Sequence, residues 1–256
     1  MMRIKYGILF ILIILLYTCE TNTGSTNSSS ERYNNYVKVP SSVSGIDFIN
    51  KIEHNLASKS NLFDYDYFYN GSGVGIADFN NDGLKDVFLC ANQAPNRLYL
   101  NKGNLTFEDI TQAAGVHHNG HSSATTWFDY DLDGNLDLYL TNIGKFTTET
   151  ISEEADYFFE GTSLPIARLA QFPDGRNPGE PDILWRNNGD GTFTDTTAAS
   201  GLGAAEWNGD VTIADVDLDG YVDVYVSNMF GQNHLYHNTG NGTFEEITHN
   251  ALDRTS

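Results

Sequence analysis

Acidic side chains recur at alternate positions in three short segments of this chain. Each segment follows the pattern D-x-[DN]-x-D-G-x-x-D, with side-chain oxygens at positions 1, 3, 5 and 9 and a usable backbone carbonyl at position 7. Two unit charges about 4 Å apart repel by roughly 4 kcal/mol at a surface-like dielectric, so such loops gain from a bound cation. The candidate metal ligands are Asp78, Asn80, Asp82, Leu84 and Asp86 in the first loop; Asp129, Asp131, Asp133, Asn135 and Asp137 in the second; and Asp215, Asp217, Asp219, Tyr221 and Asp223 in the third.

The ligand chemistry points to calcium. All the donors are oxygens, which favours a hard cation. Six or seven flexible oxygen ligands suit Ca²⁺ better than Mg²⁺, which requires a tight octahedron and retains water. The spacing resembles the EF-hand series at positions 1, 3, 5 and 7, but position 12 is Leu89, Leu140 or Val226 instead of the closing Glu. We therefore predict about three Ca²⁺ sites, each closed by the carboxylate at position 9.

The number of carboxylates differs between the loops. The first has three and an amide at Asn80, whereas the second and third have four each. Ligand charge tunes calcium affinity, so the first site should be the weakest. The alternative interpretation is a solvated acidic turn without an ion, and recurrence at the same place in three repeats argues against it.

These loops belong to a longer repeat. A second element follows each of them: "NRLYLNKGNLTFEDIT" (96–111), "DILWRNNGDGTFTDTT" (182–197) and "NHLYHNTGNGTFEEIT" (233–248). Asp78 and Asp129 are 51 positions apart, as are Leu184 and Leu235. The units therefore cover about 65–115, 116–201 with an insertion at 145–181, and 202–256.

Each unit contains four segments with strand-like composition. In the middle unit, "SATTWF" and "LDLYLTN" flank the acidic loop, and "DILWRN" and "TFTDTT" flank the hairpin signal "NGDG". Four strands in a unit of 40–50 residues are typical of β-propeller blades, with a solenoid as the alternative. We predict an all-β fold made of four-stranded antiparallel propeller blades with calcium-binding loops.

The three units amount to a partial propeller of about three blades. Closed propellers typically have four to eight blades, so we expect the natural chain to continue beyond Ser256 or its copies to assemble with a partner. "SSVSGIDF" (41–48) reads as a fragment of another unit, because "SGI" resembles the "AGV" and "SGL" that follow two of the hairpins.

The repeats resemble FG-GAP/VCBS-type repeats, the blades of integrin-α-like propellers. "NRLYLNKGNLTFEDITQAAGV" and "DILWRNNGDGTFTDTTAASGL" are most similar to the repeat proteins of the ASPIC/UnbV and cartilage-acidic-protein group. The FG-GAP signature itself is degenerate, since "NGSGVG" and "EWNGDV" stand in its place. The resemblance covers residues 65–250 and implies an extracytoplasmic calcium-binding propeller that acts in adhesion or as a binding scaffold.

The N-terminus reads as an export signal. Arg3 and Lys5 precede the apolar run "GILFILIILLY" (7–17), which is too short for an ordinary membrane span. The "LYTC" that ends in Cys19 resembles a bacterial lipobox, with an ordinary secretory signal or an uncleaved anchor as alternatives. We predict a signal peptide at 1–18, lipidation of Cys19, a flexible linker at 19–40, and a lipid-anchored location at the outer membrane or cell surface of a bacterium. Cys90, in the apolar run "DVFLCAN", is expected to be a small buried side chain.

Composition restricts the partners. A net charge of −20 argues against nucleic acid and anionic headgroups, so membrane contact should come only through the lipid anchor. We predict a calcium-binding scaffold for a protein or glycan ligand. The alternative is the scaffold part of a cell-envelope polysaccharide-degrading enzyme, although no catalytic motif is present and we predict a non-enzyme.

Two further features could contribute. His117, His118 and His121 could bind a transition metal, but loop histidines are the default interpretation. The insertion offers Tyr157, Phe158, Phe159 and Arg176 as a contact surface, or it packs over the propeller face.

Overall fold

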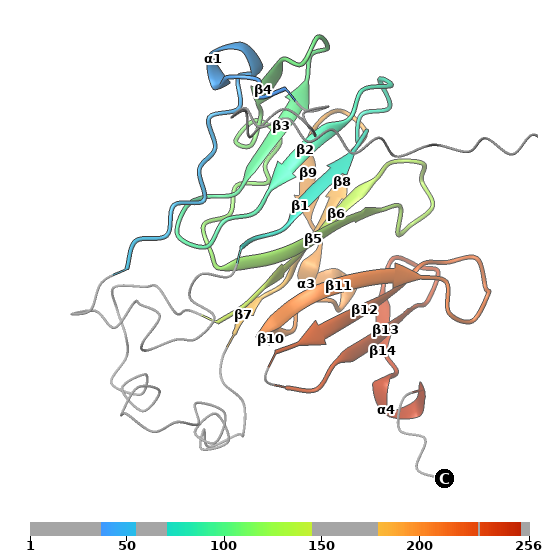
Figure 1. Ribbon diagram of the computed structural model, residues 1–256. Helices are drawn as coiled ribbons and strands as arrows, with labels where there is room; N and C mark the ends of the chain where they lie inside the picture. Colours follow the sequence, from blue (N-terminus) through green and yellow to red (C-terminus); the bar gives the residue numbers. More distant parts are fainter. Residues whose placement is uncertain (1–36, 55–70, 145–178, 230, 252–256) are drawn as a thin grey trace, which may run out of the picture. The chain divides into compact units, whose positions relative to one another are not determined.

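The computed structural model describes residues 37–54, 71–144, 179–229 and 231–251 (Figure 1). Three four-stranded antiparallel sheets dominate these residues, each with its strands in chain order apart from one short excursion. The strands are β1 (Val74–Ala77), β2 (Asp86–Leu89), β3 (Arg97–Asn101) and β4 (Phe107–Asp109) in the first blade; β5 (Ser122–Phe128), β6 (Asp137–Asn142), β8 (Ile183–Asn187) and β9 (Phe193–Asp195) in the second; and β11 (Asn208–Ala214), β12 (Asp223–Asn228), β13 (His234–Asn238) and β14 (Phe244–Glu246) in the third. Every repeat completes its own sheet, which confirms the blade interpretation.

Turn chemistry sets the boundaries of the strands. Each acidic loop joins the first and second strands of a blade, and a glycine-containing hairpin joins the third and fourth. In the three hairpins, Lys102, Asn188 and Thr239 donate their backbone N–H to the carbonyl four residues later. The hairpin glycines have positive φ, a conformation that costs glycine little.

Two hydrophobic clusters join the blades. The first combines Phe79, Phe88 and Leu98 of the first blade with Leu138, Trp185 and Phe193 of the second. The Phe79 and Trp127 rings stack 5.8 Å apart at 9°. The second cluster combines residues of the second and third blades in the same way, including Tyr130, Tyr139, Leu184, Val224, Tyr236 and Phe244. Because adjacent sheets share a core, each blade stabilises its neighbour.

A short turn leads out of the fourth strand of the first and second blades and rests on the following blade. Gly115 and Gly201, the latter ending helix α3 (Thr197–Ser200), adopt left-handed φ. A Cβ at these positions would lie 3.3 Å from the Phe193 carbonyl oxygen and 3.0 Å from that of Phe244, respectively. Helix α4 (Thr248–Ala251) begins at the corresponding place after β14.

Residues 41–48 occupy the equivalent place on the first blade. Helix α1 (Ser41–Ser44) ends at Gly45, which is left-handed, and a Cβ at this position would clash with the Phe107 carbonyl oxygen. Tyr99 Oη donates to Asp47 at 3.0 Å. This segment therefore packs as the end of a preceding unit would, in agreement with the expectation from "SSVSGIDF".

One pairing was not expected from the sequence. Strand β7 (Glu180–Pro181) pairs with β10 (Ala205–Glu206), and Gly144 bridges Gly179. Residues 179–181 of the predicted insertion therefore belong to regular structure. Residues 145–178, with Tyr157, Phe158, Phe159 and Arg176, lie outside the described residues, as do 1–36, with the predicted signal and Cys19.

Two further observations concern burial and membranes. Cys90 is buried, which confirms the expectation for this side chain, and burial raises the pKa of its thiol to about 12. Among the described residues, no helix has the length and apolar character needed to cross a membrane.

Candidate metal centres in the acidic loops

The three acidic loops share one backbone geometry. The carboxylate at position 1 accepts backbone N–H groups from positions 5 and 6: Asp78 from Asp82 and Gly83, Asp129 from Asp133 and Gly134, and Asp215 from Asp219 and Gly220, all at 2.8–3.1 Å. Position 4 is left-handed in all three, as Asn81, Leu132 and Leu218. A left-handed leucine costs roughly 1–2 kcal/mol, so the second and third loops are held in a shape that their sequences do not prefer locally.

The carboxylate at position 9 anchors each loop to its blade. Asp86, Asp137 and Asp223 are almost fully buried. Each accepts the backbone N–H of position 2, and each accepts at 2.8 Å the backbone N–H of the asparagine that ends the third strand: Asn101, Asn187 or Asn238. Burial raises the pKa of Asp137 to about 7 and also raises that of Asp86. These carboxylates are therefore both structural and close to the predicted ligands.

The same asparagines link neighbouring blades. Asn187 Nδ2 donates to the Phe79 carbonyl oxygen in the first acidic loop, and Asn238 Nδ2 donates to the Tyr130 carbonyl oxygen in the second, both at 2.9 Å. Each bond thus joins one blade to the acidic loop of the blade before it. The acidic loops therefore lie against the interfaces between blades.

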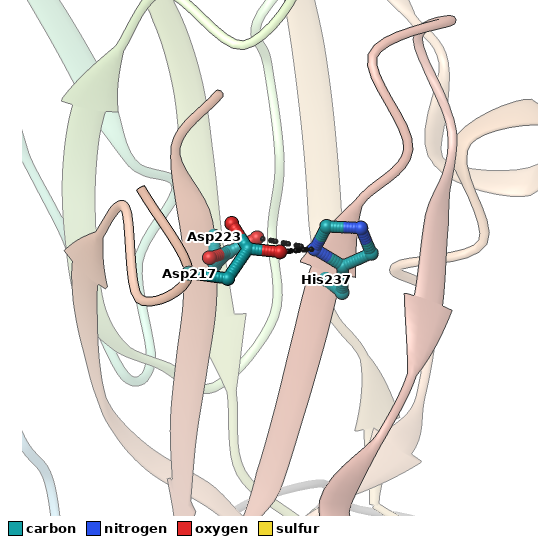
Figure 2. A group of neighbouring side chains, drawn as sticks. All are labelled: Asp217, Asp223 and His237. Atoms are coloured by element: carbon teal, nitrogen blue, oxygen red, sulfur yellow. Dashed lines mark hydrogen bonds and ion pairs between the residues drawn. The ribbon is translucent and has the colours of Figure 1, made fainter. Parts of the chain in front are cut away.

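The structure brings most of the predicted ligands of the second and third loops together. Oxygens of Asp129, Asp131 and Asp137 lie within 4.8 Å of one another, as do those of Asp215, Asp217 and Asp219. A third group joins Asp217 and Asp223 to His237 (Figure 2). In the described residues the first loop forms no such group, because Asn80 takes the place of a carboxylate. The backbone-ligand role of Leu84, Asn135 and Tyr221 stays a prediction.

One oxygen tests whether these residues fit a cation. Within the described part of the chain, Asp131 Oδ1 is buried and accepts no hydrogen bond. A shielded anionic oxygen without a partner is costly, and a cation among Asp129, Asp131 and Asp137 would satisfy it. The donors there are all oxygens, so the residues present fit a hard divalent ion.

Comparison with known proteins identifies the repeat. The model of the FG-GAP-like repeat family matches residues 67–140, 174–226 and 215–256, which together make up more than half of the chain. The chain belongs to the FG-GAP-like repeat family. This confirms the resemblance drawn from the repeat, and the three described sheets are the FG-GAP-like blades.

The chain is also similar to three curated relatives. Cartilage acidic protein 1 of Homo sapiens is 39% identical over 65% of this chain, and the Mus musculus protein is 24% identical over the same share. The alignment covers 32% of each relative. The Xenopus tropicalis protein is 32% identical over 28% of this chain and 11% of the relative. The chain therefore spans about a third of the length of the human and mouse relatives.

Sequence reasoning missed the side chains that face these FG-GAP-like loops from the third strand. Arg186 donates through Nε to Asp131 Oδ2 at 2.6 Å and through Nη2 to Asp133 Oδ2 at 2.7 Å. His237 Nδ1 lies 3.1 Å from Asp223 Oδ1 and 3.6 Å from Asp217 Oδ2. Asp133, predicted as a ligand, is thus turned toward Arg186. The available signal was the alignment of "LYLN", "LWRN" and "LYHN", in which the residue before the asparagine varies.

The remaining histidines form separate contacts. In the described residues, His117, His118 and His121 take no part in the three groups of candidate ligands. His121 is buried, with Nδ1 3.1 Å from Glu180 Oε1. His234 lies between Glu206 and Glu246, 2.9 Å from each. Burial lowers the pKa of His234, but these hydrogen bonds outweigh burial and the net shift is upward.

Proposed function

We propose that this FG-GAP-like repeat chain binds calcium in its acidic loops and acts outside the cytoplasm as a lipid-anchored scaffold for a protein or glycan ligand. The observation that carries the proposal is the convergence of carboxylates in loops of one shared geometry, with Asp131 Oδ1 left without a partner. Residues at positions 1, 3, 5, 7 and 9 of each loop would hold the ion. When bound, Ca²⁺ supplies positive charge that offsets the repulsion between carboxylates and links strands of one blade.

Calcium would stabilise the folded chain by mass action. An ion that binds only the folded form adds about 1.4 kcal/mol per site at ten times its dissociation constant. Affinities of about 10⁻⁴ to 10⁻³ M are typical of extracellular modules, where calcium is abundant. We expect EDTA to lower the melting temperature and Ca²⁺ to restore it better than Mg²⁺.

A substitution taken from the chain itself tests the ligand assignment. Asp217→Asn gives the third loop the side chain that Asn80 provides in the first, and should weaken calcium binding there by about tenfold. Asp210→Asn, which changes an exposed carboxylate on β11, is the matched control and should leave binding unchanged. Titration calorimetry measures both. Absence of calcium heat, together with no EDTA effect on melting, would contradict the proposal.

The lipid anchor rests on the N-terminal sequence. Metabolic labelling with a fatty acid should depend on Cys19, and Cys19→Ala should abolish both labelling and membrane association. Labelling that survives this substitution would remove the anchor from the proposal and leave the calcium sites untouched.

A scaffold should bind its ligand without converting it into a product. The acidic loops use their carboxylates for backbone bonds and candidate cation binding, which supports binding more than hydrolysis. A glycan array and a protein pull-down with the calcium-loaded chain should detect a partner. Release of reducing ends or unsaturated sugars from polysaccharides would instead support the enzyme alternative.

A further inference from the structure

One position of the third strand contacts the acidic loop in the second and third blades. Tyr99, Trp185 and Tyr236 pair across the sheet with Val87, Leu138 and Val224, which are equivalent residues of the second strands. The next residue along each third strand is therefore equivalent as well, and it is Leu100, Arg186 or His237. The asparagine after it anchors the position-9 carboxylate in all three blades. The backbone is constant here, and only the side chain differs.

In the second blade this side chain places a fixed positive charge among the predicted ligands. Arg186 is bonded to Asp131 and Asp133, which hold positions 3 and 5 of the loop. A guanidinium keeps its charge at any physiological pH and matches carboxylates with directed N–H bonds. The side chains of Arg186, Asp131 and Asp133 are 39%, 18% and 26% exposed, so the charges are partly shielded from water. The second loop therefore already contains a cation.

In the third blade the side chain offers a nitrogen donor. Figure 2 shows Asp217 and Asp223 turned toward the Nδ1 of His237. The three ligand atoms lie within 4.8 Å of one another. Imidazole nitrogen suits Zn²⁺ and neighbouring transition metals, whereas Ca²⁺ prefers oxygen. Metal binding at Nδ1 requires the imidazole tautomer that carries its proton on Nε2, which leaves the Nδ1 lone pair free for the ion.

In the first blade the side chain has no charge and no donor. Leu100 is partly buried and packs against the first hydrophobic cluster. At this position the third strand thus presents neither a cation nor a side-chain nitrogen to the loop carboxylates. This loop has fewer carboxylates than the other two, but Leu100 places no charge among them.

We infer that the residue at this position sets which cation each loop accepts: Leu100 leaves an all-oxygen site, Arg186 competes with Ca²⁺, and His237 favours a transition metal. The inference rests on the proposed function, because it assumes that the loops bind divalent ions. It changes the ranking drawn from carboxylate count. Among sites for Ca²⁺, the second loop becomes weaker than the first, despite its extra carboxylate.

Replacing Arg186 with the residue of the first blade tests the competition. Arg186→Leu should strengthen calcium binding at the second loop by about tenfold or more, because two like charges no longer share one cluster of carboxylates. In EDTA the same variant should melt at a lower temperature than the natural chain. Adding Ca²⁺ should then raise the melting temperature of the variant by more than that of the natural chain. Arg186→Gln, which keeps a polar chain of similar length, should behave alike and covers the case in which leucine prevents folding.

Arg97→Leu is the matched control for Arg186. Arg97 also lies on a third strand, but its Nε pairs with Asp109 at 3.2 Å, away from the acidic loop. Arg97→Leu should therefore leave calcium binding unchanged. Calcium binding that is equal in the natural chain, Arg186→Leu and Arg186→Gln would overturn the competition, while leaving the proposed calcium function intact.

Zn²⁺ titrated into the chain with Ca²⁺ in excess tests the nitrogen ligand. The natural chain should bind one Zn²⁺, and the nitrogen NMR signal of His237 Nδ1 should shift. His237→Leu and His237→Asn should each weaken this binding by about tenfold or more. His117→Leu, which removes an exposed histidine, should not. If Zn²⁺ binding survives both His237 substitutions, this part of the inference is wrong; if no variant binds any divalent ion, the proposed function itself fails.

Discussion

The second and third blades share a backbone plan and differ in the chemistry placed upon it. Both anchor the acidic loop through a buried carboxylate, Asp137 or Asp223, and both reach the preceding loop through an asparagine, Asn187 or Asn238. The side chains beside these anchors are not the same. The second blade has Arg186 where the third has His237.

A further position differs at the opposite end of the same strands. Asp182 precedes β8, whereas Asn233 precedes β13 and Asn96 precedes β3. All three accept a backbone N–H: Asp182 and Asn233 from the last residue of the second strand, Asn142 or Asn228, and Asn96 from Ala91, just beyond the end of β2. Each blade supplies a side-chain oxygen for this bond, but only in the second blade does the oxygen belong to a carboxylate. The hydrogen bond to the backbone is thus kept in all three blades, although the residue that accepts it differs in charge.

The largest expected effect comes from removing the anchor. Asp137→Ala should lower the free energy of unfolding by about 3 kcal/mol, because it leaves the buried N–H groups of Tyr130 and Asn187 without an acceptor. Asp223→Ala should cost about 1 kcal/mol less, since Val216, whose N–H it would strand, is 50% exposed and can reach water, whereas Tyr130 is 4% exposed.

Urea unfolding in EDTA measures both changes without a contribution from metal. Asp210→Ala, at an exposed carboxylate outside the loops, is the control and should change stability by less than about 0.5 kcal/mol. Equal losses for Asp137→Ala and Asp223→Ala would show that the environment of the loop does not matter and would break the comparison between the blades.

The sequence predicts the features that repeat. Equal spacing predicts the three units, alternation and hairpin signals predict the strands, and the ligand pattern predicts the loops that gather Asp129, Asp131 and Asp137 or Asp215, Asp217 and Asp219. These features depend on contacts between residues close in sequence or on a pattern present in several copies.

The remaining features depend on contacts across distant segments. Arg186 reaches Asp131 over 55 positions, and this is visible only once the register between β6 and β8 is known. The pairing of β7 with β10 joins strands of two residues each, too short to carry a periodic pattern. The spacing of Asp133 alone predicts one more metal ligand. The structure shows that this carboxylate also accepts a hydrogen bond from Arg186.

A smaller effect is expected from the charge of Asp182. This carboxylate is fully buried, and burial raises its pKa from 3.8 to about 7. Between these values the folded chain holds a proton that the unfolded chain has released, so stability should fall as pH rises through the window. The slope cannot exceed about 1.4 kcal/mol per pH unit for one group.

Asp182→Asn gives the second blade the residue of the other two and should remove this slope. Because Asp137 has its own raised pKa, the quantity to compare is the difference between the two pH profiles of unfolding free energy. A difference that stays constant from pH 4 to 7 would mean that Asp182 does not titrate in this range in the folded chain.

The smallest effect compares the asparagines at the ends of the third strands. The Asn187 amide donates to Leu136 O in its own blade and to Phe79 O in the first blade, whereas the Asn101 amide donates to Lys85 O in its own blade. Both accept a hairpin N–H through Oδ1. The two alanine substitutions should therefore differ by one inter-blade hydrogen bond, about 1 kcal/mol, with Asn187→Ala the more destabilising. Asn238→Ala, which loses the corresponding bond to Tyr130 O, should match Asn187→Ala, and a loss as small as that of Asn101→Ala would show that the bond between blades contributes nothing measurable to stability.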